Sequence, residues 1–417
     1  MIAETQSLSR SRPDEPRIVA PTLVALAIFI GSWTLLHVGF YRHDQVLDTP
    51  IYQRYGNAIA NGQLPYRDFR VEYPPGALPM FALPGLARPG HDQDVTPGFR
   101  RTFESLIWLC GAAALISSAF ALRALGASQA HVWAALVFIA LAPLAIGSVL
   151  LSRFDLWPAA LVAASLALLL SDRLRLGCVT LGLAVAVKLF PAVLAPLAVA
   201  YVWRRAGRRE AIVCLAFLVG AVGIVFAPFV AVAPAGVWHS LTGQLTRPLQ
   251  IESIGSALLL AAHHAWGFGV TMATSHGSQN LVGGAPHAFE LALSALQAAA
   301  LVATWIVFAR GRATKERLVL ASGAALVAFV ALGKVFSPQF LIWLVPVVPL
   351  VGGRRGLRAS ALLALALVLT QLWFPYRYWD LANHFDALAS WLVLARDIVM
   401  VVLLVVLFPR DAAQAAA

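Results

Sequence analysis

"IVAPTLVALAIFIGSWTLLHVGFY", residues 18–41, contains no acidic or basic side chain other than His37. A helix crosses the hydrocarbon core of a bilayer with about 20 apolar residues, so this stretch is long enough to span. It is too long for a signal-peptide core and lacks a small-residue cleavage site, so we expect it to persist as a membrane helix. Arg10, Arg12 and Arg17 precede it and predict a cytoplasmic N-terminus.

The composition extends this interpretation to the whole chain. Of 417 residues, 60% are hydrophobic and 12% are charged, whereas soluble domains have about a quarter of their residues charged. We therefore predict a multi-pass membrane protein. The net charge of +11 fits the arginine excess of cytoplasmic loops, and no basic helix or aromatic-basic repeat indicates nucleic acid. Cys110, Cys178 and Cys214 each lie in an apolar run without CxxC spacing, which predicts neither a disulfide nor a metal site.

The stretch 74–87 decides the topology. It carries Pro74, Pro75, Pro79 and Pro84, and proline removes backbone donors and kinks helices, so we expect a re-entrant or interfacial piece. Residues 42–102 then form one long outer loop. We predict twelve spans, at 18–41, 103–122, 131–150, 156–170, 176–187, 189–203, 211–230, 287–309, 318–332, 340–351, 359–373 and 388–408.

The expected fold class is an all-α polytopic membrane protein of about twelve helices, with short interfacial helices in the first outer loop. We divide the chain into a cytoplasmic tail (1–17), a first membrane module (18–230), an extracytoplasmic loop (231–286), a second membrane module (287–408) and a cytoplasmic tail (409–417). Most arginines then fall on the inner side, as membrane insertion favours, whereas the alternative topology puts the cluster at 204–209 outside. The expected location is the plasma (inner) membrane.

This topology places the polar segments together on the outer face. The topology itself follows from the apolar runs and the arginine distribution alone. Asp48 follows the first span, and a carboxylate in surroundings of low dielectric can act as a general base. The alternative is that Asp48 caps a helix at 50–60, since Asp-Thr-Pro is a good helix start. Both roles can coexist.

Cations on the same face are candidates for binding a phosphate. Lys188 is one of three lysines and lies at a membrane boundary, where it could also only snorkel to the interface. Arg153 and Asp155, in "SRFD", could form only a local ion pair, an alternative favoured for Asp155. Arg247 and Glu252, in "RPLQIES", could be a solvated pair.

Other residues give weaker signals. Tyr52, Tyr66, Tyr73, Trp157 and Trp343 fall at interface depth, where aromatic belts are the default, although tyrosines in a groove also suit a sugar or a polyprenyl ligand. The histidines, including His43, His263, His264 and His276, lack metal-site motifs, so no metal is predicted. No Walker loop or GxGxxG indicates nucleotide binding.

Five segments together resemble a known family. "DTPIYQRYGNAIANGQLPYRDFRVEYPP", "SRFDLWPA", "AVKLFPAVLAPL", "RPLQIES" and "FSPQFLIWLVP" are similar, in this order, to membrane glycosyltransferases of the GT-C class, and more narrowly to glycosyltransferase family 87. The resemblance implies that 18–230 is a GT-C-like catalytic module and that the donor is a polyprenyl-phosphate sugar. It also implies Asp48 as catalytic base, and it requires no cofactor or metal.

The resemblance leads to a hypothesis for the reaction. A hexose, by preference mannose, moves by inverting displacement from polyprenyl phosphate to a lipid-linked or glycan acceptor on the extracytoplasmic face. Lys188, Arg153 and Arg247 bind the donor phosphate; Tyr52, Glu72, Tyr73, Asp155, Glu252, Lys334 and Gln339 support the cavity. The alternatives are an arabinofuranosyltransferase, or a transporter or flippase of lipid-linked sugar, although the charges lie at the outer rim rather than deep in several helices.

Overall fold

The computed structural model describes residues 16–42, 46–87 and 95–409. The predicted tails therefore lie almost wholly outside the described residues, as do Arg10, Arg12 and His43. The described chain is nearly all α-helical. The one difference in class is a β-hairpin of β1 (Thr271–Ser275) and β2 (Ser278–Val282), paired antiparallel within the loop that was expected at 231–286.

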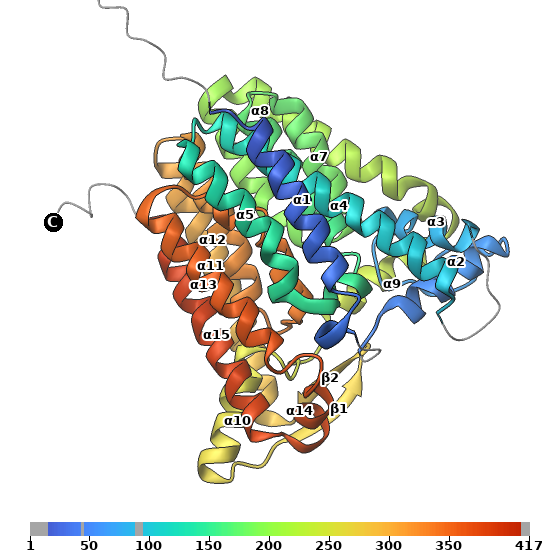
Figure 1. Cartoon of the computed structure of the whole chain (residues 1–417). Helices are drawn as coiled ribbons and strands as arrows, with labels where there is room; N and C mark the ends of the chain where they lie inside the picture. The colour runs from blue at the N-terminus through green and yellow to red at the C-terminus, as the bar shows by residue number, and fades with distance from the viewer. Residues whose placement is uncertain (1–15, 43–45, 88–94, 410–417) are drawn as a thin grey trace, which may run out of the picture.

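Long helices lie side by side and run between two ends of the molecule (Figure 1). In chain order they are α1 (Val19–Leu35), α4 (Pro97–Ala124), α5 (Gln129–Ile146), α6 (Leu156–Leu170), α7 (Leu174–Val187), α8 (Ala195–Val232), α11 (Gly284–Arg310), α12 (Lys315–Ala331), α13 (Gly353–Gln371) and α15 (Ala387–Leu407). Five helical segments of the described residues are long and apolar enough to cross a membrane: Pro97–Ala124, Gln129–Ser152, Phe190–Val232, Gly284–Arg310 and Ala387–Leu407. The count of twelve spans stays a prediction.

Three of the predicted spans take a different form. Residues 340–351 are not an α-helix: they form the 3₁₀ turns η5 (Pro338–Trp343) and η6 (Val348–Leu350), since Pro346 and Pro349 remove donors that an α-helix needs. The spans expected at 189–203 and 211–230 both fall in the segment of η4 (Phe190–Leu194) and α8. Gly207, with φ of +87°, breaks the helical backbone of α8 between them.

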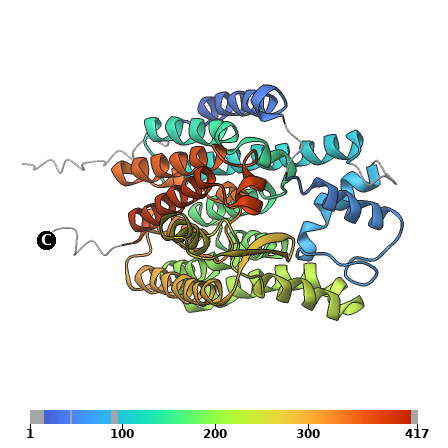
Figure 2. The same cartoon turned by 90° about the horizontal axis from the view of Figure 1, so that it is seen from below.

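One end of the molecule, which we call the basic end, carries most of the arginine-rich turns. There Arg205 pairs with Asp172 at 2.7 Å, Arg175 pairs with Glu210 at 2.7 Å, and Lys315 donates to the carbonyl of Ala124. The described chain starts and finishes at this end (Figure 2): Gln129 binds the carbonyl of Arg17, and Arg355 that of Phe408.

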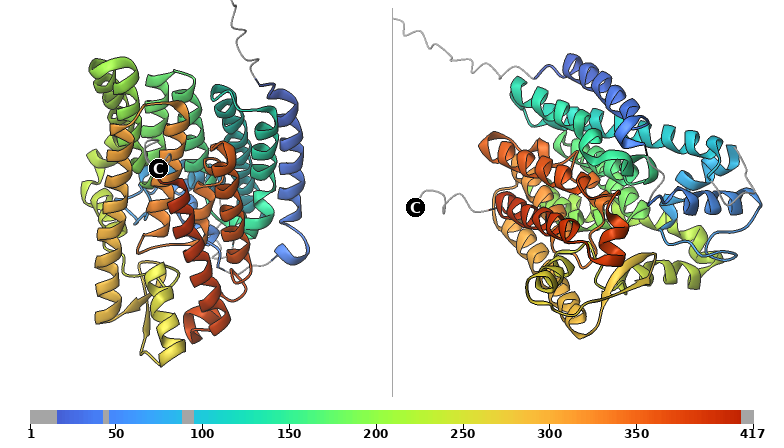
Figure 3. Two further views of the ribbon diagram at one scale, coloured as in Figure 1. Left: turned by 90° about the vertical axis from the view of Figure 1, so that its left-hand side faces the viewer. Right: turned by 60° about the horizontal axis from the view of Figure 1, so that its bottom comes forward.

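The opposite end, the polar-loop end, carries the short elements. They are α2 (Thr49–Ala60), η2 (Pro75–Ala77), α3 (Pro79–Ala87), η3 (Gly147–Ser152), α9 (Pro234–Leu245), α10 (Ile254–Trp266), the β-hairpin and α14 (Tyr378–His384). Figure 3 shows the hairpin and α10 at this end, with α10 alongside α11 and α15. The stretch expected to be interfacial, 74–87, is η2 followed by α3, and α3 packs on α2.

The core lies between the long helices and is built from small and branched side chains. α12 is one of the most enclosed helices, with Ala321, Ala324, Ala325 and Ala328 all fully buried. Small residues let neighbouring backbones approach closely in a membrane protein. Cys110, Cys178 and Cys214 are buried free thiols, as the sequence indicates.

Candidate active site

Asp48 and Arg153 form the first half of the site. Asp48 occupies the N-cap position of α2, but its side chain makes no capping hydrogen bond. Instead its Oδ1 lies 2.9 Å from Nη1 of the buried Arg153, and the Tyr52 hydroxyl donates to Oδ2 at 3.3 Å. Arg153 also donates to the carbonyl of Val46 at 3.0 Å. The carboxylate is thus directed to a distant cation rather than to its own helix.

Asp155 and Lys188 form the second half. Lys188 follows α7 in extended conformation, and its Nζ lies 2.7 Å from Oδ1 of Asp155. The indole N–H of Trp343 donates to the same oxygen at 2.6 Å. The side chain of Asp155 is 1% exposed and that of Lys188 is 17% exposed. Arg153 and Asp155 therefore do not form the local pair that their spacing allowed, since each binds a residue far away in sequence.

The segment before α6 joins the two halves. Between Arg153 and Asp155, the fully buried Phe154 packs edge-on against Tyr73, with ring centroids 4.8 Å apart. Lys188 Nζ lies 4.9 Å from the centroid of the same ring and 5.2 Å from that of Trp343, within the range of cation–π attraction. Three consecutive side chains thus connect Asp48 with Lys188.

Burial sets the electrostatics of Asp48. Desolvation raises the pKa of its carboxyl, and the charges of Arg153 and Lys188 act in the opposite direction. The side chain still keeps 24% exposure. A partly exposed carboxylate with a raised pKa can accept a proton more readily than an ordinary aspartate.

Glu252 adds a second buried carboxyl at this end. It is 2% exposed, and Gln250 donates to its Oε2. Desolvation raises its pKa to about 8, against the opposing charges of Arg396, Arg153 and Arg247. The segment that carries it is held by the hairpin, since Leu281 donates to the carbonyl of Leu249 and Ile251 donates to that of Gln279.

Arg247 and Glu72 lie at the edge of this group. Arg247 is half-buried, and its charge lowers the pKa of Glu72, although desolvation raises that pKa more. Glu72 is exposed, and Gln244 of α9 donates to its carbonyl at 3.0 Å. Tyr73 is next to Glu72, and with Tyr52 it builds an aromatic wall that includes Phe81 and Phe154.

Two predicted residues lie apart from the paired charges. The amine of Lys334 is held by Glu290 at 2.8 Å and by the carbonyl of Leu245 at 3.0 Å, so it ties α11 to the end of α9. Gln339 is half-buried in η5, and its side chain makes no hydrogen bond within the part of the chain that the structure describes.

The site also includes residues that the sequence analysis did not assign to it. Trp343 was expected in an interfacial belt, but it is buried and binds Asp155. Arg396 and Asp397 pair at 2.8 Å inside α15, and Arg396 donates to the carbonyl of Glu252. Their position as a charged pair within an apolar span was the available signal, because such groups in membrane helices are usually functional.

Several buried polar atoms at this end have no hydrogen-bond partner within the described residues. They include Arg153 Nε, Asp155 Oδ2, Arg247 Nε and Glu252 Oε1. Buried polar groups normally find a partner, so these two donors and two acceptors mark capacity for binding a polar ligand. Among the described residues, no group of three or more His, Cys, Asp or Glu side chains is placed to hold a metal ion.

Comparison with known proteins identifies the family of the chain. A search of curated proteins found no match. The model of glycosyltransferase family 87 matches residues 72–338, which include Glu72, Arg153, Asp155, Lys188, Arg247, Glu252 and Lys334; Asp48, Tyr52 and Gln339 lie outside the match. Because the match covers more than half of the chain and the apolar helices are those of a membrane protein, the chain belongs to glycosyltransferase family 87 and is a membrane glycosyltransferase.

Proposed function

We propose that this glycosyltransferase moves a hexose, mannose by preference, from a polyprenyl-phosphate donor to a hydroxyl of a lipid-linked or glycan acceptor. The reaction takes place at the polar-loop end, which faces the extracytoplasmic side. The observation that carries the proposal is the linked set of Asp48, Arg153, Asp155 and Lys188. It puts a partly exposed carboxylate next to cations that can bind a phosphate.

Asp48 is the general base in this mechanism. It takes the proton of the acceptor hydroxyl while that oxygen bonds to the anomeric carbon. The bond from this carbon to the phosphate oxygen breaks, and polyprenyl phosphate leaves with the electron pair. A single displacement inverts the anomeric centre, so a β-linked donor gives an α-linked product. The raised pKa of Asp48 favours proton uptake at the moment of attack.

Cations stabilise the charge that develops on the leaving phosphate. Arg153 and Arg247 each have a buried Nε–H with no partner in the described protein, so both can donate without giving up a contact. Lys188 has to share its charge between the phosphate and Asp155. Asp155 and Trp343 keep the amine in place, and the aromatic wall of Tyr52 and Tyr73 offers a surface for the sugar.

Asp48→Asn tests the base. The amide keeps the shape and an acceptor for Arg153 but takes up no proton, so we expect sugar transfer to fall to background while donor binding persists. The assay uses reconstituted protein with radiolabelled polyprenyl-phosphate mannose and, in parallel, polyprenyl-phosphate arabinose. The control is Asp68→Asn, in the same loop, where Asp68 pairs with the exposed Arg67.

The results of this assay distinguish a mannosyltransferase from an arabinofuranosyltransferase and from a flippase. Transfer from the arabinose donor alone replaces mannose by arabinose, and donor movement across the bilayer without transfer identifies a flippase. Near-normal transfer by Asp48→Asn removes Asp48 from the role of base.

A further inference from the structure

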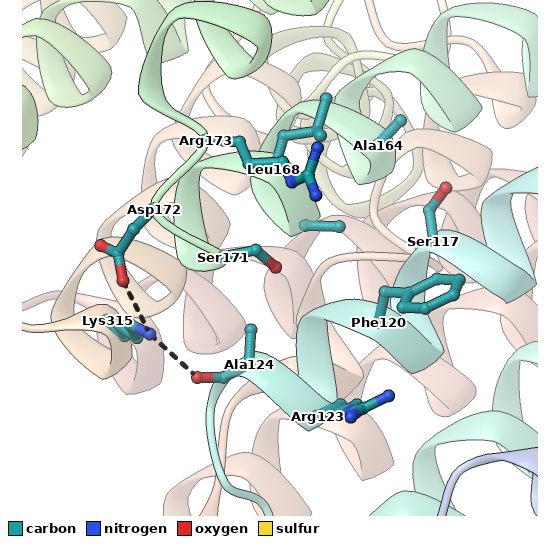
Figure 4. Close-up of a pocket in the computed structure, with 11 residues that line it drawn as sticks. Ser117, Phe120, Arg123, Ala124, Ala164, Leu168, Ser171, Asp172, Arg173 and Lys315 are labelled. Carbon is teal, nitrogen blue, oxygen red and sulfur yellow. Dashed lines mark hydrogen bonds and ion pairs between the residues drawn. The ribbon is translucent and has the colours of Figure 1, made fainter.

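A cavity lies at the basic end, away from the candidate active site. Its volume is about 740 Å³, and it is lined by residues of α4, α6, the α6–α7 turn and the start of α12. Figure 4 shows Arg173 and Ser171 on one side, Ser117, Phe120 and Arg123 of α4 on the other, and Lys315 at the edge.

This cavity is separate from the reacting groups. Asp155 precedes α6, whereas Ser171 and Arg173 follow it. α6 has 15 residues, and at about 1.5 Å per residue the helix is roughly 23 Å long. A ligand of ordinary headgroup size in the cavity therefore does not touch Asp48 or Lys188.

The lining is basic. Arg123, Arg173 and Lys315 contribute cations, and Asp172 is the one carboxylate among the lining residues. Asp172 already pairs with two cations, since Arg205 binds its Oδ1 at 2.7 Å and Lys315 lies 3.4 Å from its Oδ2. The hydroxyls of Ser117 and Ser171 add two neutral donors. Cations with hydroxyl groups are the partners that a phosphate prefers.

An exposed apolar stripe of α4 leads to this cavity. Leu109, Ile116 and Phe120 are all exposed, Phe120 to 50%, and Arg123 follows Phe120 by three positions. Residues three, four and seven apart lie on one face of a helix, so the stripe and the arginine line up. A soluble phosphate has no apolar part that could contact this stripe, whereas the acyl chain of a lipid can pack along it.

We propose that the cavity at the basic end binds the phosphate of an anionic lipid headgroup, with the acyl chain along the exposed face of α4. Arg173 and Lys315 contact the phosphate, and Ser171 donates to it. Basic pockets between membrane helices bind anionic lipids in this way. The site is independent of the sugar-transfer reaction and adds a lipid-binding function to the opposite end of the protein.

Native mass spectrometry of the full chain in detergent, titrated with phosphatidylglycerol, tests the site. The double variant Arg173→Gln/Lys315→Gln removes two of the three cations that line the cavity, so we expect it to bind the lipid at least tenfold more weakly. The matched control is Arg354→Gln/Arg358→Gln, which removes the same charge from exposed positions at the start of α13.

A second variant separates folding from binding. Ala164→Met keeps every charge and fills the cavity from α6, so it should also lower phosphatidylglycerol binding while phosphatidylcholine adducts stay unchanged. Equal lipid binding by the parent protein and both cavity variants overturns the proposal. Glycerol 3-phosphate that competes as strongly as the lipid overturns the lipid assignment and identifies a soluble phosphate ligand.

Discussion

Lys188 and Asp155 form a buried ion pair that should stabilise the fold, and in the proposed mechanism its amine also binds the donor phosphate. Removing one partner of a buried pair leaves the other charge uncompensated, which costs about 3–5 kcal/mol. We expect Lys188→Gln to fall at the low end of that range, because the amine keeps some exposure. Thermal unfolding in detergent measures the loss.

The double variant Lys188→Gln/Asp155→Asn distinguishes the two roles. It removes both charges, so most of the lost stability should return. If the amine also binds the donor phosphate, transfer should remain about 10²–10³-fold below the parent. A stable double variant with full transfer activity would limit Lys188 to a structural role.

Glu252 should make stability depend on pH. Its pKa is about 8 in the folded protein, against an ordinary value of 4.5. Between these values the unfolded chain releases the proton and the folded chain keeps it, so stability falls as pH rises from about 4.5 to about 8. The contribution of Glu252 to stability is fully present below about pH 4.5.

Thermal unfolding of Glu252→Gln, which does not ionise, checks this dependence. The variant should lose part of the decline with pH and exceed the parent in midpoint temperature at pH 8.5. Glu210→Gln, at the basic end, where Arg175 pairs with Glu210, should keep the decline. Parallel pH profiles for the parent and Glu252→Gln would contradict the assignment.

At the scale of elements, the contact of α2 with α3 positions Asp48. The two helices cross at Gly56 and Gly85 with backbones in contact: a Cβ added at Gly85 would lie 2.4 Å from the carbonyl carbon of Gly56, and one at Gly56 would lie 2.4 Å from the carbonyl oxygen of Phe81. No side chain larger than hydrogen fits between them.

Gly85→Ala should therefore push the two helices apart. Overpacking of this kind costs about 1–3 kcal/mol, and because α2 begins directly after Asp48, we expect transfer to fall together with stability. Gly220→Ala in α8 is the control, since an added Cβ there meets nothing within 4 Å. Unfolding midpoints and transfer rates measure both, and unchanged values for Gly85→Ala would show that the crossing can relax.

At the scale of the whole molecule, the two ends should face opposite sides of the membrane. The basic end carries the arginine-rich turns and so should be cytoplasmic. The native thiols are buried, which gives a low background for single added cysteines. Arg358→Cys should resist a membrane-impermeant thiol reagent in intact cells, and Thr271→Cys, at the exposed start of β1, should react. The reverse pattern would invert the topology and move the active site to the cytoplasm.

The sequence by itself determined the class of protein, the family and the polar segments that meet at the candidate site. Apolar runs long enough for a bilayer predict membrane helices in any tertiary context, and the prolines at 74–87 predict a break. The polar segments between the runs could be identified because charged groups are rare in so apolar a chain. The form of residues 340–351 and the hairpin were missed, since neither depends on apolar length alone.

Only the tertiary structure decided which charged side chains form ion pairs with each other. Arg153 and Asp155 are two positions apart in sequence, yet Arg153 pairs with Asp48 and Asp155 pairs with Lys188. Trp343, expected in an interfacial belt, is buried and donates to Asp155. Lys334, of the same residue type as Lys188, binds Glu290 instead. Partners of this kind are separated by 33 to 188 positions. No local pattern encodes such pairs, because the packing of the long helices alone brings them within hydrogen-bond distance.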